Sequence, residues 1–61
     1  MEETFLVKVR FRNDAGYREV VGWLIRHDGR RLHIKTLEGG EERVSKSDLE
    51  ELEIVGVLYG D

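Results

Sequence analysis

The sequence contains no cysteine and no proline, and Met1 is its only methionine. Without cysteine, neither a disulfide framework nor a thiolate metal site can stabilise the chain. No apolar run approaches the roughly 20 residues that a membrane span requires, and the acidic Glu2-Glu3 start differs from a basic signal peptide. We therefore expect a soluble, unprocessed protein with no membrane partner, which would be cytoplasmic if it is natural.

Length and charge indicate one small domain. A chain of 61 residues is near the lower limit for folding alone, where about 60% of the unfolded surface is buried. Charged residues make up 38% of the chain and the net charge is −3, which predicts a hydrated surface rather than a basic tail. We expect residues 1–61 to form a single domain. Charges at residues 41–46 would protect a strand edge and favour a monomer, whereas apolar residues 54–59 keep a dimer open.

Alternation predicts the first strand, over residues 4–12. Its apolar side chains share one face of the strand: Phe5, Val7, Val9 and Phe11. Residues 13–16 form a turn cluster of Asn, Asp, Ala and Gly. A four-residue loop would pair Val9 with Val20, which we prefer, and a five-residue loop would pair Val9 with Val21.

Residues 17–36 are predicted to form the central hairpin of the fold. Asp28-Gly29 suits a type I′ turn, which needs positive φ at both central positions. This turn would place Trp23 opposite Ile34 and would make Arg26 and Arg31 a like-charge cross-strand pair. Because residues 20–25 are apolar on both faces, we expect this strand to bend at Gly22.

The remaining chain predicts two more strands and one helical turn. A loop over residues 38–40, with left-handed Gly40, would pair Ile34 with Val44. Ser47-Asp48-Leu49-Glu50 has the pattern of a capping box and predicts a single helical or 3₁₀ turn. The last strand is expected over residues 52–59, with a bend at Gly56.

This order of elements resembles the SH3-like and Sm-like small β-barrels. We therefore expect an all-β, five-stranded SH3-like barrel with one 3₁₀ or helical turn before the last strand. The segment from Gly22 to Asp28 resembles the Gly-x-Leu-x-x-x-Asp part of the first Sm motif, and Ile54-Val55-Gly56 resembles the Ile-Arg-Gly of the second. Residues 29–32 lack the base-contacting Asn of that family, and Val55 replaces its Arg, so the resemblance implies the architecture without the RNA pocket.

Aromatic residues are too few for two other binding sites found on this architecture. A peptide-binding SH3 groove needs clustered aromatic side chains, and a Tudor-like cage needs three or four around a methylated cation. We expect Phe5, Phe11 and Trp23 to pack in the core, which leaves Tyr17 and Tyr59. Neither the proline groove nor the cage is predicted.

The residue types also favour a protein that is not an enzyme. His27 and His33 are the only histidines, and the predicted hairpin puts them on opposite faces, so they would not share a metal ion or an acid–base site. The serines have no predicted base beside them, and no Gly-rich loop has phosphate-binding spacing. We expect no catalytic residues, no cofactor and no metal.

One surface is a candidate for binding. We define the basic face as the cationic set around the predicted hairpin turn: Arg26, Arg30, Arg31, His33 and Lys35. It would suit RNA, single-stranded DNA or an acidic protein. The plainer interpretation is a solvated surface, with Glu19 or Glu42 as nearby counter-charges.

Local sequence features agree with each other throughout the chain. Glycines fall where turns and bends need them, and a capping pattern opens the short helical turn. This agreement favours an idealised, de novo designed small β-barrel scaffold without a natural activity. The alternative is a natural, non-enzymatic binding module that uses the basic face.

Overall fold

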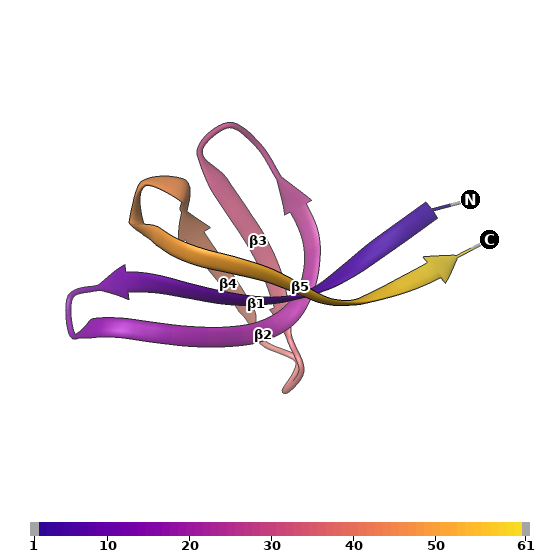
Figure 1. Cartoon of the computed structure of the whole chain (residues 1–61), viewed down its shortest axis with the longest axis horizontal. Helices are drawn as coiled ribbons and strands as arrows, with labels where there is room; N and C mark the ends of the chain where they lie inside the picture. Colours follow the sequence, from indigo (N-terminus) through magenta and orange to yellow (C-terminus); the bar gives the residue numbers. More distant parts are fainter. Residues whose placement is uncertain (1, 61) are drawn as a thin grey trace.

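The computed structural model describes residues 2–60, which form one antiparallel sheet with the strand order β4-β3-β2-β1-β5 (Figure 1). The elements are β1 (Glu2–Asn13), β2 (Gly16–His27), β3 (Arg31–Thr36), β4 (Glu41–Ser45), the 3₁₀ turn η1 (Lys46–Asp48) and β5 (Leu49–Gly60). The expected all-β class is confirmed, as are the five strands and the single 3₁₀ turn before the last strand.

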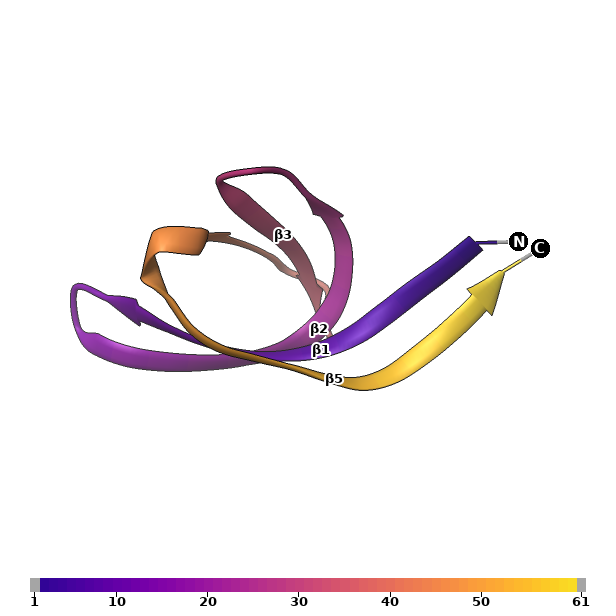
Figure 2. The same cartoon turned by 45° about the horizontal axis from the view of Figure 1, so that its top comes forward.

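The sheet is curled but not closed, which corrects the expectation of a barrel. Strands β4 and β5 are its two edges, and no strand pairing joins them within residues 2–60. The 3₁₀ turn η1 carries the chain from β4 to the start of β5 across the curl (Figure 2). Strand β5 then begins beside β1, where Leu49 pairs with Phe11. The Lys46 N–H donates to the Arg30 carbonyl over 2.8 Å and ties this crossing to the β2–β3 loop.

The core lies inside the curl. Its buried side chains come from every strand except β5: Val7, Val9, Phe11, Val20, Leu32, Ile34 and Val44. Phe5, Leu24 and Leu49 pack against them and are partly buried. The alternation predicted for β1 is therefore correct, because its odd-numbered apolar residues face the core.

The pairing of β1 with β2 agrees with the preferred register. Val9 lies opposite Val20, and Asn13 lies opposite Gly16 at the end of the ladder. Gly16 has φ of 116°, a conformation that residues with a Cβ rarely adopt. The Asn13 side-chain oxygen accepts from the Ala15 N–H over 2.9 Å, which is the local hydrogen bond that makes Asn common in turns.

The pairing predicted for β2 and β3 is wrong by one residue up to Leu24 and by two residues from Arg26 onward. Leu24, not Trp23, lies opposite Ile34, and Ile25 forms a bulge before Arg26 pairs with His33. The physical reason is that β2 has a single buried face: Val20 and Leu24 already face the core beside β1, so β3 must supply Leu32 and Ile34 to that same side. The type I′ turn is also absent, because Gly16 and Gly39 are the glycines with positive φ among residues 2–60.

The turn between β3 and β4 has the predicted type but lies one residue earlier. The Gly39 N–H donates to the Thr36 carbonyl, and the Gly40 carbonyl accepts from the Thr36 N–H. Gly39, with φ of 96°, takes the left-handed position that we expected for Gly40. Val44 consequently pairs with Leu32 rather than with Ile34, although it stays on the core face.

The predicted capping box is not formed. Ser45 is the N-cap residue of η1 and makes no side-chain capping hydrogen bond. Its hydroxyl lies 2.9 Å from the Ser47 hydroxyl instead. In a 3₁₀ turn this short, Ser47 lies inside the turn rather than before it, so its side chain cannot act as the cap.

Gly22 allows β2 to bend over β3, as the sequence predicted. A Cβ built on Gly22 would overlap the Lys35 carbonyl oxygen and would lie 2.7 Å from Cγ2 of Ile34. Ile34 is fully buried, so neither neighbour can move away cheaply. The bend visible in β2 therefore depends on a residue without a side chain (Figure 1).

We predict that Gly22→Ala lowers the free energy of unfolding by about 1–3 kcal/mol, the usual cost of overpacking a core. Urea denaturation followed by circular dichroism measures this change. Gly29→Ala is the matched control, because nothing lies within 4 Å of its added Cβ. The control should keep or raise stability, by up to about 1 kcal/mol. Equal losses in both variants would contradict the close approach at Gly22.

Candidate functional site

Three residues of the basic face meet on the outer surface of the sheet, away from the core. Arg31, His33 and Lys35 alternate with buried Leu32 and Ile34 along β3, so they point outward. Arg26 lies opposite His33. The predicted Arg26–Arg31 pair is therefore wrong, because the bulge at Ile25 shifts the register of β2 against β3.

Arg43 of β4 joins this surface and lies directly opposite His33. Arg26, His33 and Arg43 therefore form a row across β2, β3 and β4, which we call the cationic row. Arg43 was not among the residues predicted from the sequence, although alternation with buried Val44 indicates that it faces outward. Its partner on β3 depended on the β3–β4 register. The predicted loop over residues 38–40 would have put Arg43 opposite Lys35, whereas the structure puts it opposite His33.

The cationic row has no acidic partner among the described residues. The two ion pairs of residues 2–60 lie elsewhere: Lys8 with Glu19 at 3.5 Å and Arg18 with Glu42 at 3.1 Å. Glu19 and Glu42, the counter-charges suggested by the sequence, are thus engaged with other cations. Two arginines beside one histidine are mutually unfavourable, and an anion would relieve this repulsion.

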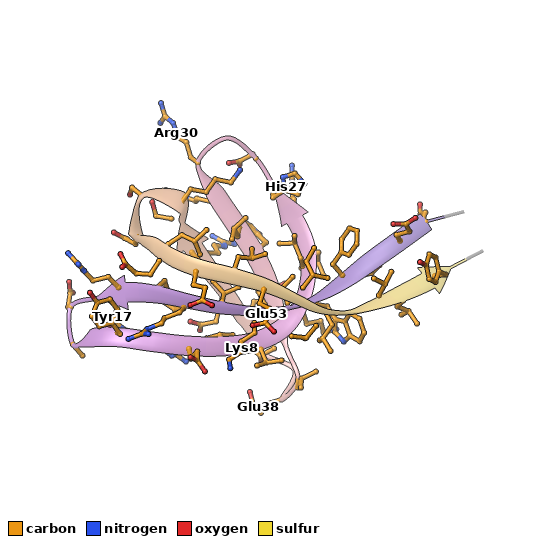
Figure 3. All side chains as sticks on the ribbon, in the orientation of Figure 1. Lys8, Tyr17, His27, Arg30, Glu38 and Glu53 are labelled. Carbon is orange, nitrogen blue, oxygen red and sulfur yellow. The ribbon has the colours of Figure 1, made fainter. Side chains whose placement is uncertain are left out.

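Asp28 organises the loop that carries Arg30. Its Oδ1 accepts from the backbone N–H of Arg30 over 2.7 Å and from that of Arg31 over 2.9 Å. These hydrogen bonds, that of Arg30 first, lower the pKa of Asp28 below its ordinary value. The Arg30 side chain points away from the body at the tip of the loop (Figure 3), so Arg30 is not part of the cationic row.

Trp23 brings an aromatic ring to the same outer surface. It pairs with Lys35 on β3 and with Leu6 on β1. We expected Trp23 in the core, but the structure leaves it half-buried on the outer face. Trp23 is thus next to Lys35 in the ladder and three positions from Arg26 along β2. Cations beside an aromatic ring are the chemical groups that bind single-stranded nucleic acid.

The outer surface of β1, β2 and β5 differs from the cationic row because its charges compensate each other. Lys8 pairs in register with Glu53, and Arg10 lies between Glu19 and Glu51; Figure 3 shows Lys8 and Glu53 on this side. The hollow between these side chains is only about 90 Å³, well below the roughly 300 Å³ of a small ligand pocket.

Tyr17 stands at the far end of β2 and is held by arginines of β1. The Arg10 guanidinium lies 4.8 Å from the ring centre, and Arg12 donates to the Tyr17 hydroxyl over 3.1 Å. These contacts occupy the ring and its hydroxyl. Tyr17 is therefore a less accessible stacking surface than its exposure suggests.

The two histidines lie on opposite faces of the sheet. His27 pairs with Leu32, whereas His33 pairs with Arg26 and Arg43. Within residues 2–60, no three His, Cys, Asp or Glu side chains are grouped in a way that could hold a metal ion. The same residues include no helix long and apolar enough to cross a membrane.

Comparisons with known protein families, with curated proteins and with solved structures found no match to this chain. The proposed function therefore rests on the residues of the cationic row and their neighbours.

We predict that the carboxylate of Asp28 stabilises the fold in a pH-dependent way. Because its pKa is lower in the folded than in the unfolded chain, its contribution is present above the unfolded pKa and is lost as the pH falls through the folded pKa. The difference in unfolding free energy between the wild type and Asp28→Asn should be constant above about pH 5 and shrink below about pH 4.

Thermal and urea unfolding at several pH values measures this difference. Asp14→Asn is the control, since it removes the same charge from another turn, where no hydrogen bond to Asp14 is formed among residues 2–60. If Asp28→Asn and Asp14→Asn followed the same pH profile, the loop contacts of Asp28 would not be the cause.

Proposed function

We propose that this protein is a non-enzymatic module that binds single-stranded nucleic acid, RNA in the first instance, through the cationic row and Trp23. The observation that carries the proposal is the row itself: Arg26 and Arg43 flank His33 on one surface. Guanidinium groups bind phosphate oxygens through parallel hydrogen bonds. Arg31 extends the same cationic surface along β3 and would contact a neighbouring phosphate, whereas Lys35 lies between Trp23 and Glu41 in the ladder.

Trp23 favours nucleic acid over an acidic protein. An acidic peptide would need only the cations, whereas a single strand offers bases that stack on an aromatic ring next to them. Trp23 lies beside Lys35 in the ladder, so one nucleotide could place its base on the ring and its phosphate near Lys35 or Arg26. Binding of an acidic protein instead of RNA is the other result that the binding experiment below can show.

At the level of architecture, we propose that the chain is an open relative of the SH3-like and Sm-like small barrels. Supporting features are the five antiparallel strands, the bent β2 and the one-turn η1 before β5. This resemblance of architecture carries no functional residue to this chain.

We predict that Arg26→Gln and Arg43→Gln each weaken binding to a fluorescent mixed-sequence single-stranded RNA. Removing one phosphate-binding side chain should also reduce the salt dependence of the affinity, with the logarithmic slope falling by about 0.7. Fluorescence anisotropy titrations at low and physiological salt measure both quantities. The double variant should lose most of the affinity while keeping the circular dichroism spectrum of the fold.

Arg18→Gln is the matched control, because Arg18 lies on the opposite face of β2 and pairs with Glu42. It removes the same charge and should leave RNA affinity nearly unchanged. An equal loss in Arg18→Gln would indicate only a general charge effect. A wild-type affinity that ignores salt would contradict phosphate binding, and preference for an acidic peptide over RNA would favour the protein partner.

The idealised, de novo designed scaffold without a natural ligand is the alternative prediction. If it is right, the NMR spectrum should be well dispersed, and the amide chemical shifts of Arg26, His33 and Arg43 should not change when RNA is added. Cooperative melting at an ordinary mesophile temperature would speak against it.

A further inference from the structure

Strand β5 is a long sheet edge that nothing in residues 2–60 covers. It spans 12 residues and pairs only with β1, so its other side presents unpaired backbone N–H and C=O groups. Natural proteins protect such edges with Lys, Pro or other charged residues. Residues 54–60 of β5 carry no charge and no proline, and the bulge at Val55 is the one protective feature among them.

Apolar side chains are exposed along this uncharged stretch. The exposed fractions are 55% for Ile54, 45% for Val55, 56% for Leu58 and 62% for Tyr59. In Figures 1 and 2, the start of β1 and the end of β5 leave the curled body together as a two-stranded ribbon. The ribbon pairs Glu2, Glu3 and Thr4 of β1 with residues 58–60 of β5, so its apolar side chains come from β5. A two-stranded ribbon is only marginally stable in water, and a partner along the apolar β5 edge would stabilise it.

The surface area supports the same conclusion. The chain exposes 4717 Å², whereas a monomeric protein of 7.1 kDa is expected to expose about 4,100 Å². The excess of about 600 Å² approaches the roughly 800 Å² that each partner contributes to a standard protein interface.

We propose that a second copy of this chain covers the ribbon, with the two β5 strands pairing antiparallel around a two-fold axis at Gly56. This register places Ile54 opposite Leu58 and Val55 opposite Val57 of the partner copy. Glu53, the nearest charge, lies opposite the Tyr59 position. A register centred on Glu53 would oppose two glutamates, which disfavours it.

The other sheet edge is a poor partner for β5. Strand β4 carries Glu41, Glu42 and Arg43 in its five residues, so pairing it with β5 would put charges beside Ile54 and Val57. Such head-to-tail contact would also build rings or open chains rather than a closed dimer. An identical β5 strand is apolar in the same place and satisfies both edges at once.

Val55→Lys tests the dimer with little effect on the single chain. Val55 is the bulged residue of β5, since Leu6 pairs with Gly56 and Val7 pairs with Ile54. Its side chain is already exposed, and a lysine at this point would put two positive charges next to the proposed axis. We expect the dissociation constant of the dimer to rise at least about tenfold, as edge lysines oppose strand pairing.

Light scattering after size exclusion, over a dilution series, measures the mass. The wild type should approach twice the 7.1 kDa chain mass, and Val55→Lys should stay at the mass of one chain. Leu37→Lys is the matched control, because Leu37 is 62% exposed in the β3–β4 turn, and it should dimerise as the wild type does. A wild-type mass of one chain at every concentration, or a mass above two chains, would overturn the proposal.

Two further variants keep the test decisive if Val55→Lys does not fold. Leu58→Lys should also dissociate the dimer, and dimerisation of a folded Leu58→Lys variant would overturn the proposal. In the cysteine-free chain, Gly56→Cys should form an intermolecular disulfide, since directly opposed residues lie about 4.5–5.5 Å apart at Cα. Gly29→Cys, in the distant loop, should cross-link much more slowly, and equal rates would contradict the two-fold axis at Gly56.

Discussion

The close approach of β2 and β3 at Gly22 is the constraint on which the rest of the structure depends. Since Gly22 has no Cβ to collide with the Lys35 carbonyl and the Ile34 methyl group, β2 can bend and give one buried face to both of its neighbours. That single face requires Leu32, Ile34 and Val44 to point into the curl. Since side chains alternate across a sheet, the same requirement turns His33 and Arg43 outward. The cationic row is thus a consequence of core packing and local charge.

The two surfaces proposed for binding lie toward opposite edges of one sheet. The cationic row ends at β4, whose charges protect that edge, and the apolar ribbon ends at β5. A dimer through β5 would therefore leave the cationic row of both copies accessible. A nucleic acid long enough to reach both rows would bind the dimer more tightly than one row, because the second contact becomes intramolecular once the first has formed. No strand pairing joins these two edges within residues 2–60.

The exposed edge bears on the idea of an idealised scaffold. That idea rests on agreement among turns, bends and capping signals, and two of the predicted features do not form in the structure. Gly29 does not adopt positive φ, and the Ser47 pattern does not form a cap. An idealised design would also protect the apolar edge at residues 54–60. Unprotected apolar edges and unpaired cationic rows are features that binding explains more directly.

Local sequence patterns by themselves determined the number of strands, the buried face of β1 and the bend at Gly22. Each depends on alternation or on a glycine that acts within a few residues. Tertiary structure decided the β1–β2 register, for which the sequence left two loop lengths open. It also decided the β2–β3 register, the place of the left-handed glycine and the open sheet. The turn signals at Asp28-Gly29 and Gly39-Gly40 each allow two registers, and only the shared core selects between them. Because Arg26, His33 and Arg43 come from three strands, their meeting depended on those registers and could be seen only in the folded sheet.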